Sequence, residues 1–341
     1  MQRLIKSVLY LVAMFGTLGK VHSQDLHFSQ YFHNPLFINP ANTGFSPDDD
    51  WRVGLQYRNQ WNALSAQPYR TMSAWGDVQL FNNRLETGWV GLGGGILSDR
   101  AGQGSLTATR SFANIAYHQQ LGLGSLLSVG FSSSYTQKRI DPTRLTFDNQ
   151  WNGKFFDVNI PSGESFATTN VGYFALQAGL NYAYFPSDRA YFNVGVSVAN
   201  LNAPKESFLT ANSNADVTVP MRYNVFLNGS FKLNDQWIIN PNIYYSQMAG
   251  ATETVVGFNA QYNLTGDGSK QLLAGLYARV GDAVAPMVGY QLNNYKIMVS
   301  YDATVSSLST FNRSNGAYEL GIVKSGVFSS GKAVKCPTVK F

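Results

Sequence analysis

Cysteine is almost absent from this chain of 341 residues, which has only Cys336. A disulfide framework and a zinc site built on several cysteines are therefore excluded. Charged residues make up 13% of the sequence, about half of the ~25% that is usual in soluble globular proteins. No apolar run as long as the ~18 residues of a membrane-spanning helix lies beyond the N-terminus. A bundle of membrane helices is therefore excluded as well.

Glycine and aromatic residues are abundant instead. The chain has 32 glycines and an aromatic content of 14%, and its mean hydropathy is −0.14. The charge content is too low for a disordered chain, which is rich in charge and poor in aromatic residues. This composition favours a β protein that presents apolar side chains outward as well as inward.

The first 23 residues have the pattern of an export signal. Arg3 and Lys6 precede a short apolar segment, residues 7–18, which is too short to span a membrane. Because Val21 and Ser23 are small enough for the cleavage positions, we predict that residues 1–23 are a signal peptide cleaved after Ser23. Cleavage removes three of the 25 basic residues, against 20 acidic ones, so no basic surface for nucleic acid is expected.

From residue 51 onward the sequence alternates between apolar and polar residues. Trp51, Val53 and Leu55 alternate with Arg52 and Gly54, and the same period of two returns along the chain. Successive side chains of a strand point to opposite faces, so each segment predicts a strand with one apolar face. We count about fourteen segments, most of them long enough for the ~9–11 residues that a tilted strand needs to cross a bilayer. They begin near residues 51, 69, 89, 106, 125, 173, 190, 220, 237, 252, 270, 283, 295 and 316.

The connections between these segments alternate in length. Long connections occupy residues 141–172, 202–219 and 306–315, whereas most of the intervening ones are tight turns rich in Asn, Asp and Gly. Long loops on one side and short turns on the other are typical of transmembrane barrels. We therefore predict an all-β fold, a transmembrane antiparallel β-barrel of about fourteen strands at 51–326. An N-terminal periplasmic or lumenal strap at 24–50 precedes it, and a tail at 327–341 follows.

A soluble β-sandwich is the alternative fold, but its polar face would normally carry many Lys and Glu residues. Here the polar face consists of Ser, Gly, Asn, Gln and Thr with occasional charges, as in a barrel lumen. Aromatic residues rim the apolar face and predict the interfacial girdles of a membrane barrel. They are Trp51, Trp61, Trp89, Tyr173, Trp237 and Tyr301.

Residues 30–44 carry the most distinctive motif, Gln-Tyr-Phe-His-Asn-Pro followed by Phe-Ile-Asn-Pro-Ala-Asn-Thr-Gly. Further matching segments are Tyr-Arg-Asn-Gln-Trp at 57–61, the glycine-rich strand at 91–95 and Met-Val-Ser-Tyr-Asp at 298–302. With these motifs the chain resembles the PorP/SprF family, outer-membrane proteins of the type IX secretion system in Bacteroidota. The likeness covers nearly the whole mature chain. Many outer-membrane barrels end their last strand on a C-terminal aromatic residue. Phe341 is the last residue here, but Pro337 and a Lys-rich tail separate it from the last predicted strand.

The resemblance implies an outer-membrane protein that works with the components of the type IX translocon. Its expected partners are secreted proteins with a type B C-terminal sorting domain, such as gliding adhesins, which it docks, helps to export or retains at the cell surface. Outer-membrane lipid is a further partner. The residues by themselves leave open a FadL-like or porin-like channel for small solutes, which the polar lumen face allows.

Two segments are candidates for contact with a protein partner. The strap has aromatic residues that need a partner surface, and its two Asn-Pro pairs disfavour helix. It either binds a secretion partner or only closes the barrel floor. The long loop after residue 141 has an aromatic cluster suited to anchoring an interface, or to packing as a lid over the barrel mouth. The candidate residues are Tyr31, Phe32, Asn34, Pro35, Asn39, Pro40, Phe147, Trp151, Phe155 and Phe156.

Seven charged residues fall on the polar faces of the predicted strands. Because the first and last strands become neighbours when a barrel closes, we expect Arg52 and Arg58 to reach Asp302 and Glu319 across the seam. These charged side chains either form ion pairs with one another inside the lumen or hold a ligand. The seven lumen charges are Arg52, Arg58, Asp77, Arg279, Lys296, Asp302 and Glu319.

Catalysis has little support in the sequence. His27, His33 and His118 stand in no recognisable Ser-His-acid motif. The glycines at 91–95 lack the following Lys-Ser/Thr of a phosphate-binding loop. The acids at 141, 148 and 157 lack the spacing of a calcium-binding EF-hand. We expect neither an enzyme nor a cofactor or metal.

Overall fold

The computed structural model describes residues 28–46, 49–61, 68–81, 85, 87–102, 104–122, 124–164, 168–206, 208, 218–312 and 314–328. The predicted signal peptide, its cleavage site after Ser23 and the predicted tail from residue 329 onward lie outside the described residues. No helix among the described residues is long and apolar enough to cross a membrane.

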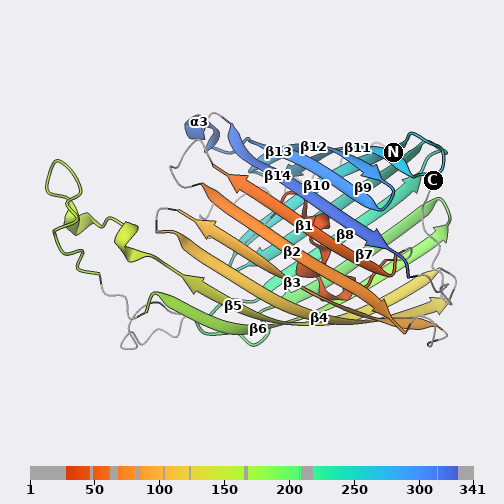
Figure 1. Ribbon diagram of the computed structural model, residues 1–341, viewed down its shortest axis with the longest axis horizontal. Helices are drawn as coiled ribbons and strands as arrows, with labels where there is room; N and C mark the ends of the chain where they lie inside the picture. The colour runs from red at the N-terminus through yellow and green to blue at the C-terminus, as the bar shows by residue number, and fades with distance from the viewer. Residues whose placement is uncertain are drawn as a thin grey trace, which may run out of the picture.

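Fourteen strands in the described part of the chain form one closed antiparallel barrel (Figure 1). Each strand pairs with its neighbours in the sequence, and β1 pairs with β14. The predicted all-β barrel of about fourteen strands is confirmed. The strands are β1 (Trp51–Gln60), β2 (Tyr69–Leu80), β3 (Gly88–Ala101), β4 (Leu106–Gly122), β5 (Ser125–Arg139), β6 (Asn170–Ser187), β7 (Ala190–Ala199), β8 (Arg222–Lys232), β9 (Trp237–Met248), β10 (Ala251–Asn263), β11 (Lys270–Arg279), β12 (Ala283–Leu292), β13 (Tyr295–Thr304) and β14 (Asn315–Gly326).

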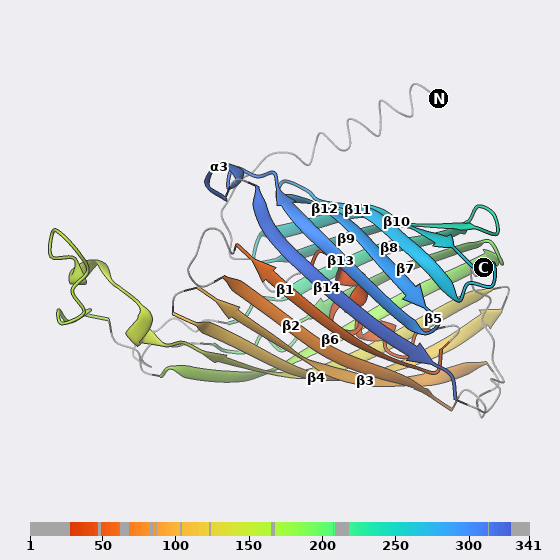
Figure 2. The same ribbon diagram turned by 45° about the horizontal axis from the view of Figure 1, so that its top comes forward.

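The two ends of the barrel differ. One end, here called the loop end, carries the connections 61–68, 102–105, 140–169, 200–221, 249–250, 280–282 and 305–314. The other, the turn end, carries the connections 81–87, 123–124, 188–189, 233–236, 264–269 and 293–294, and the four longest connections between strands are all at the loop end. The connection between β5 and β6 projects beyond the barrel at the loop end (Figure 2). Short helices lie in the loop-end connections, namely η3 (Pro142–Arg144), η4 (Asp148–Gln150) and α3 (Ser309–Asn312).

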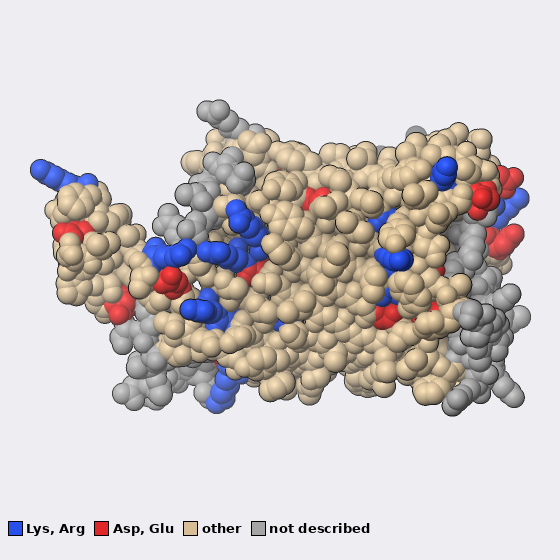
Figure 3. Space-filling model, in the orientation of Figure 1, with Lys and Arg blue, Asp and Glu red and all other residues tan. Residues whose placement is uncertain are grey.

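The barrel wall has an apolar outer face. Large hydrophobic side chains such as Leu55, Phe131 and Phe174 are exposed outward, while Ser, Asn and Gln residues of the same strands are buried inward. Lys, Arg, Asp and Glu gather toward the two ends of the visible surface and leave a broad band between them nearly free of charge (Figure 3). A bilayer solvates such a band without leaving charges in hydrocarbon.

Two aromatic residues predicted for the outer girdle face the lumen instead. Trp89 is 3% exposed and Tyr173 6% exposed. The indole Nε1 of Trp89 donates a hydrogen bond to the carbonyl oxygen of Gly44 at 2.9 Å, and the ring stacks on His118. The sequence did not reveal this orientation, because an aromatic residue at the end of a strand fits either face.

The described part of the predicted strap lies inside the barrel (Figures 1 and 2). Its short helices are η1 (Tyr31–His33), α2 (Pro35–Ile38) and η2 (Pro40–Asn42). Pro35 and Pro40 occupy first helical positions, where proline fits because no backbone donor is lost. The side chain of Asn39 accepts a hydrogen bond from the backbone nitrogen of Ala41 and so caps η2. The two Asn-Pro pairs thus mark the starts of single helical turns. Residues 28–46 are called the plug from here on.

Candidate functional site

The plug is fixed to the barrel wall by hydrogen bonds from its buried polar residues. Asn39 donates from Nδ2 to the carbonyl oxygens of Leu180 on β6 and Val196 on β7, at 2.9 and 3.2 Å. The carbonyl oxygen of Ile38 accepts from Ser197 Oγ on β7 at 2.7 Å. The residues of the Asn-Pro-Ala motif therefore bridge two neighbouring strands.

The next part of the plug contacts strands β2 and β4, on the other side of β5 from β6 and β7. The backbone nitrogen of Gly44 donates to Asp77 Oδ2 on β2 at 2.7 Å. The carbonyl oxygen of Thr43 lies 2.8 Å from Nε2 of His118 on β4. Gly44 has a positive φ of 67°, a conformation that glycine adopts without a Cβ penalty. The conformation of Gly44 thus brings the plug to the wall of β2, β3 and β4.

Glycines of the wall provide the space that the plug occupies. A Cβ added at Gly130 on β5 would overlap the backbone of Ala41, and one at Gly91 on β3 would overlap the carbonyl of Thr43. A Cβ at Gly179 on β6 would overlap the side chain of Asn39. Glycine within a strand often marks such a close approach of another backbone. This contact surface was not predicted from the sequence, although glycines within strands are the pattern that could have indicated it.

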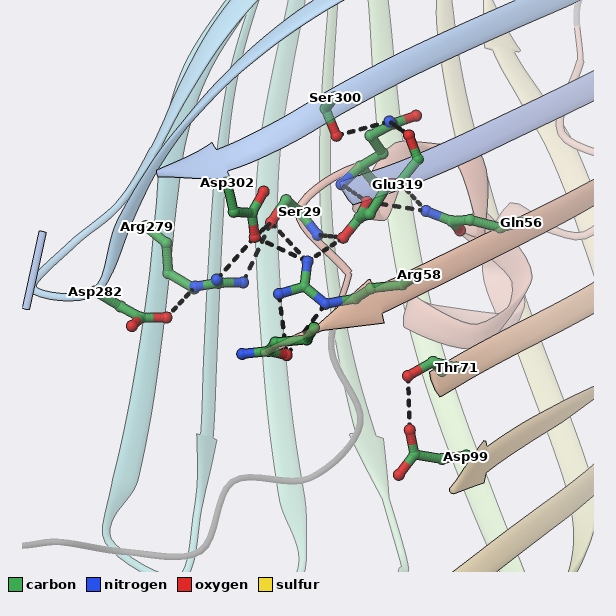
Figure 4. Close-up of polar contacts among 12 residues, drawn as sticks. Ser29, Gln56, Arg58, Thr71, Asp99, Arg279, Asp282, Ser300, Asp302 and Glu319 are labelled. Carbon is green, nitrogen blue, oxygen red and sulfur yellow. Dashed lines mark hydrogen bonds and ion pairs between the residues drawn. The ribbon is translucent and has the colours of Figure 1, made fainter. Parts of the chain in front are cut away.

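A buried charge cluster joins the start of the plug to the barrel seam (Figure 4). Nη1 of Arg58 on β1 lies 2.8 Å from Asp302 Oδ2 on β13 and also pairs with Glu319 on β14. Nη2 of Arg279 on β11 lies 3.0 Å from the same Asp302 oxygen. All four side chains are at most 5% exposed. Two arginines therefore compensate two carboxylates inside the barrel.

Ser29 brings the plug into this cluster. Its Oγ donates to Asp302 Oδ2 at 2.7 Å, and its backbone nitrogen donates to Glu319 Oε1 at 2.7 Å. The backbone nitrogen of Gln30 donates to the other Glu319 oxygen at 2.9 Å. Hydrogen bonds to an ionised acceptor are about twice as strong as neutral ones. The carboxylates of Asp302 and Glu319 thus bind both the arginines and the first residues of the plug.

The remaining predicted lumen charges lie elsewhere in the barrel. Arg52 pairs with Asp77 on the neighbouring strand β2, and its Nη2 donates to the carbonyl oxygen of Asn42 in the plug at 2.9 Å. Arg52 lies near the turn end of β1, six residues from Arg58, so it reaches Asp77 rather than the carboxylates of the seam. Lys296 shares the lumen-facing side of β13 with Ser300.

The protonation of His33 is set by its surroundings in the plug. The side chain is buried, and neither ring nitrogen has a hydrogen-bond partner among the described residues. Burial of the ring lowers the pKa of His33 to about 3, and the positive charge of Lys296 acts in the same direction. His33 is therefore neutral at physiological pH.

A cavity of about 360 Å³ separates the plug from the wall of β6 to β9 near the turn end. Aromatic rings and amide side chains line it together with Arg52. Its volume falls within the ~300–1,000 Å³ of ligand pockets. The lining residues are Tyr31, Phe32, Pro35, Ile38, Asn42, Phe45, Ser46, Arg52, Phe185, Tyr191, Asn193, Phe226, Asn228, Ser230 and Asn240.

The candidate contact residues of the strap occupy different positions in the plug. Tyr31, Asn34, Asn39 and Pro40 are buried, and Phe32 and Pro35 are half-buried. Tyr31 stacks on Tyr244 of β9, and Asn34 Nδ2 donates to Ser73 Oγ of β2 at 3.0 Å. Tyr31, Phe32 and Pro35 border the cavity.

The candidate residues of the long loop lie far from the plug. Phe147 is half-buried, whereas Trp151, Phe155 and Phe156 are 50%, 58% and 45% exposed. Trp151 and Phe156 form an isolated bridge, and their ring centroids are 5.1 Å apart. Gln150 supports this turn, because its Nε2 donates to the carbonyl oxygen of Ile160 at 3.0 Å. The loop therefore displays three aromatic side chains on a locally ordered support.

Among the described residues no group of three or more His, Cys, Asp or Glu side chains is arranged to hold a metal ion.

His118, which stood in no recognisable motif, contacts Ser128 Oγ at 2.7 Å and the plug at Thr43. This role could not be predicted from the sequence, because a single histidine on a strand does not reveal its partner.

The comparisons with solved structures show the fold. The toluene transporter TodX of Pseudomonas putida matches with a TM-score of 0.52 and 12% identity, over 84% of this chain and 91% of that one. The monoaromatic hydrocarbon channel CymD matches with a TM-score of 0.51 and 10% identity, over 87% and 94% of the two chains. A comparison with the sequences of curated proteins gave no match.

The family comparison covers nearly all of the barrel. The model of the type IX secretion system membrane protein PorP/SprF matches residues 20–323. The closed barrel and this match support a location in the outer membrane and a non-enzymatic role in secretion or as a channel. The chain belongs to the PorP/SprF family of type IX secretion system membrane proteins.

Proposed function

We propose that this outer-membrane component of the type IX secretion system docks exported proteins that carry a type B C-terminal sorting domain, and helps to export them or retain them at the cell surface. The observation that carries the proposal is the loop between β5 and β6, which displays Trp151, Phe155 and Phe156 beyond the barrel. Aromatic residues are enriched at protein interfaces, and Trp is among the residues that most often contribute large binding energies there.

The turn end supplies the second contact of the proposed function, with a component of the translocon. Phe32 and Pro35 border the cavity near the turn end. A partner reaches these two residues through the cavity, or it displaces the plug from the wall. With a cleaved signal and an N-terminus in the periplasm, the turn end faces the periplasm and the loop end faces the cell exterior.

Binding to a purified sorting domain tests the docking role. The full-length barrel in detergent micelles is mixed with a type B sorting domain, and their affinity is measured for the native chain and for Trp151→Ser/Phe156→Ser. We expect binding by the native chain and a loss of at least about tenfold in the variant. Equal affinity of the two proteins contradicts docking through this loop.

Deletion of the gene tests the same role in the cell. The expected result is that a cargo with a type B sorting domain stays inside the cell or is shed into the medium. Normal surface display of every such cargo in the deletion strain contradicts the docking function as a whole.

The cavity favours a second candidate function, a channel for small solutes. The chain shares its barrel fold with a toluene transporter and a monoaromatic hydrocarbon channel. The plug, however, contacts the wall across the lumen, at β6 and β7 and at β13 and β14. Conductance of the purified barrel in a planar bilayer separates the two functions, because a docking protein with a seated plug conducts little and a channel conducts steadily.

A further inference from the structure

Three arginines face outward at the loop end of strands β2, β3 and β5. Arg70 on β2 lies directly opposite Arg100 on β3, and Arg100 lies opposite Thr107 on β4. Thr107 in turn lies opposite Arg139 on β5. Arg70, Arg100 and Arg139, called the arginine row from here on, are exposed. Basic side chains gather over this part of the loop end in the space-filling view (Figure 3).

The arginine row lies beside the surface that lipid covers. Arg70 shares the outer face of β2 with Met72, which is 53% exposed and two residues away, or about 7 Å along the strand. Arg100 and Arg139 share their outer faces with Ile96 and Tyr135, each four residues away. Side chains that follow an apolar belt at this spacing lie at the level of the lipid head groups.

The charges of the row are poorly compensated by the protein. Like charges directly opposite each other on neighbouring strands are destabilising, and Arg70 faces Arg100 in this way. Neither Arg70 nor Arg139 has an ion-pair partner among the residues that the structure describes. The site therefore has an excess of positive charge that an anion would relieve.

Ser105 and the start of the long loop complete the site. Nη2 of Arg100 and Nη1 of Arg144 both donate to Ser105 Oγ, at 2.9 and 3.2 Å. Nε of Arg144 also lies 3.0 Å from Oδ2 of Asp141 and forms an ion pair with this carboxylate. Ser105 thus joins Arg100 of the row to Arg144 of the long loop.

We propose that the arginine row binds the phosphate head group of a lipid in the leaflet at the loop end. Guanidinium groups match the oxygens of a phosphate with two parallel hydrogen bonds, and they do so more specifically than lysine. Neighbouring strands are about 4.8 Å apart, so Arg70 and Arg100 reach one phosphate together. The ligand is a lipid rather than free phosphate because the same face of each strand continues into the apolar belt, which holds the acyl chains.

This site is separate from the loop aromatic residues that carry the docking proposal, so the two proposals fail independently. Head groups bound at the row fix the depth and rotation of the barrel in the membrane. They also lie beside the base of the long loop, since Arg144 of that loop and Arg100 of the row both donate to Ser105 Oγ.

Lipid binding to the purified full-length barrel tests the proposal. The protein in detergent is titrated with phosphatidic acid, with phosphatidylcholine of the same acyl chains and with sodium phosphate, and bound lipid is counted by native mass spectrometry. We expect phosphatidic acid to bind the native chain about tenfold more tightly than phosphatidylcholine. Sodium phosphate at the same concentration should not displace it.

Two pairs of substitutions locate the site. Arg70→Ser/Arg100→Ser should abolish the preference for phosphatidic acid, whereas Arg189→Ser/Lys270→Ser, which removes two exposed charges at the turn end, should retain it. Arg70→Lys/Arg100→Lys keeps the charge and should retain part of the preference. This lysine variant is also the control for a serine variant that loses binding because it misfolds. Equal binding of the two lipids, equal losses in both serine pairs, or displacement by sodium phosphate overturns the proposal.

Discussion

Arg58 on β1 lies directly opposite Glu319 on β14, and their side chains form a buried ion pair across the seam where the barrel closes. The same guanidinium reaches Asp302 on β13. Closure of the wall and seating of the plug therefore depend on one set of charges, because Ser29 and Gln30 bind the same carboxylates.

Removing the positive charge of this cluster should destabilise the barrel. In Arg58→Met the carboxylates of Glu319 and Asp302 stay buried with less compensation, and we expect a loss of about 3–5 kcal/mol in the free energy of unfolding. Urea unfolding in lipid vesicles measures it. Arg189→Met, at an exposed position of a turn, is the matched control and should change stability little. An unchanged free energy for Arg58→Met would show that the cluster does not support the fold.

Filling the space beneath the plug should release it. In Gly130→Ala the new Cβ overlaps the backbone of Ala41, so the plug must shift or leave the lumen. We expect higher conductance in planar bilayers and faster proteolysis of residues 28–46. Gly76→Ala on the outer face is the control, since its Cβ would meet Val53 Cγ1 at 3.3 Å and no plug atom. Identical conductance of both variants and the native chain would contradict a plug held by close packing.

Seating of the plug should weaken as the pH falls. His33 has a pKa of about 3 when buried, against about 6.5 in a released plug. The released form therefore binds a proton between these two pH values that the seated form does not, and the plug loses stability as the pH falls below 6.5. The expected loss is about 2 kcal/mol at pH 5 relative to pH 7.

Proteolysis of the plug at pH 7 and pH 5 measures this effect. His33→Gln has no titrating ring, and its rate should change less between the two pH values than that of the native chain. The same pH response in both proteins would assign the effect to other groups, such as the carboxylates of the seam.

Substituting the loop aromatic residues should leave the barrel intact. Trp151 and Phe156 contact each other and are exposed in the connection between β5 and β6, so Trp151→Ser/Phe156→Ser should change the free energy of unfolding by no more than about 0.5–1 kcal/mol. Urea unfolding beside the binding assay distinguishes a lost contact surface from a damaged fold. A large loss of stability would show that the loop packs on the barrel.

The alternating residues by themselves determined the strands, their approximate number and the closure of the barrel, because each strand must turn an apolar face to lipid and leave no open edge. Segments expected to begin at residues 51, 69, 106, 125 and 190 begin there in the structure. The expected start at Tyr173 lies three residues inside β6, since Asn170 already pairs with Arg139 of β5.

Only the tertiary structure decided how the inside of the barrel is filled. A period of two shows which face of a strand turns inward, but not what that face meets. Gly130, Gly91 and Trp89 acquire their roles only when residues 39–44 lie against them, and these contacts join segments far apart in the sequence. The same holds for Arg70 and Arg139, which come to lie at one level of the wall through the pairing of four strands and have no local pattern that relates them.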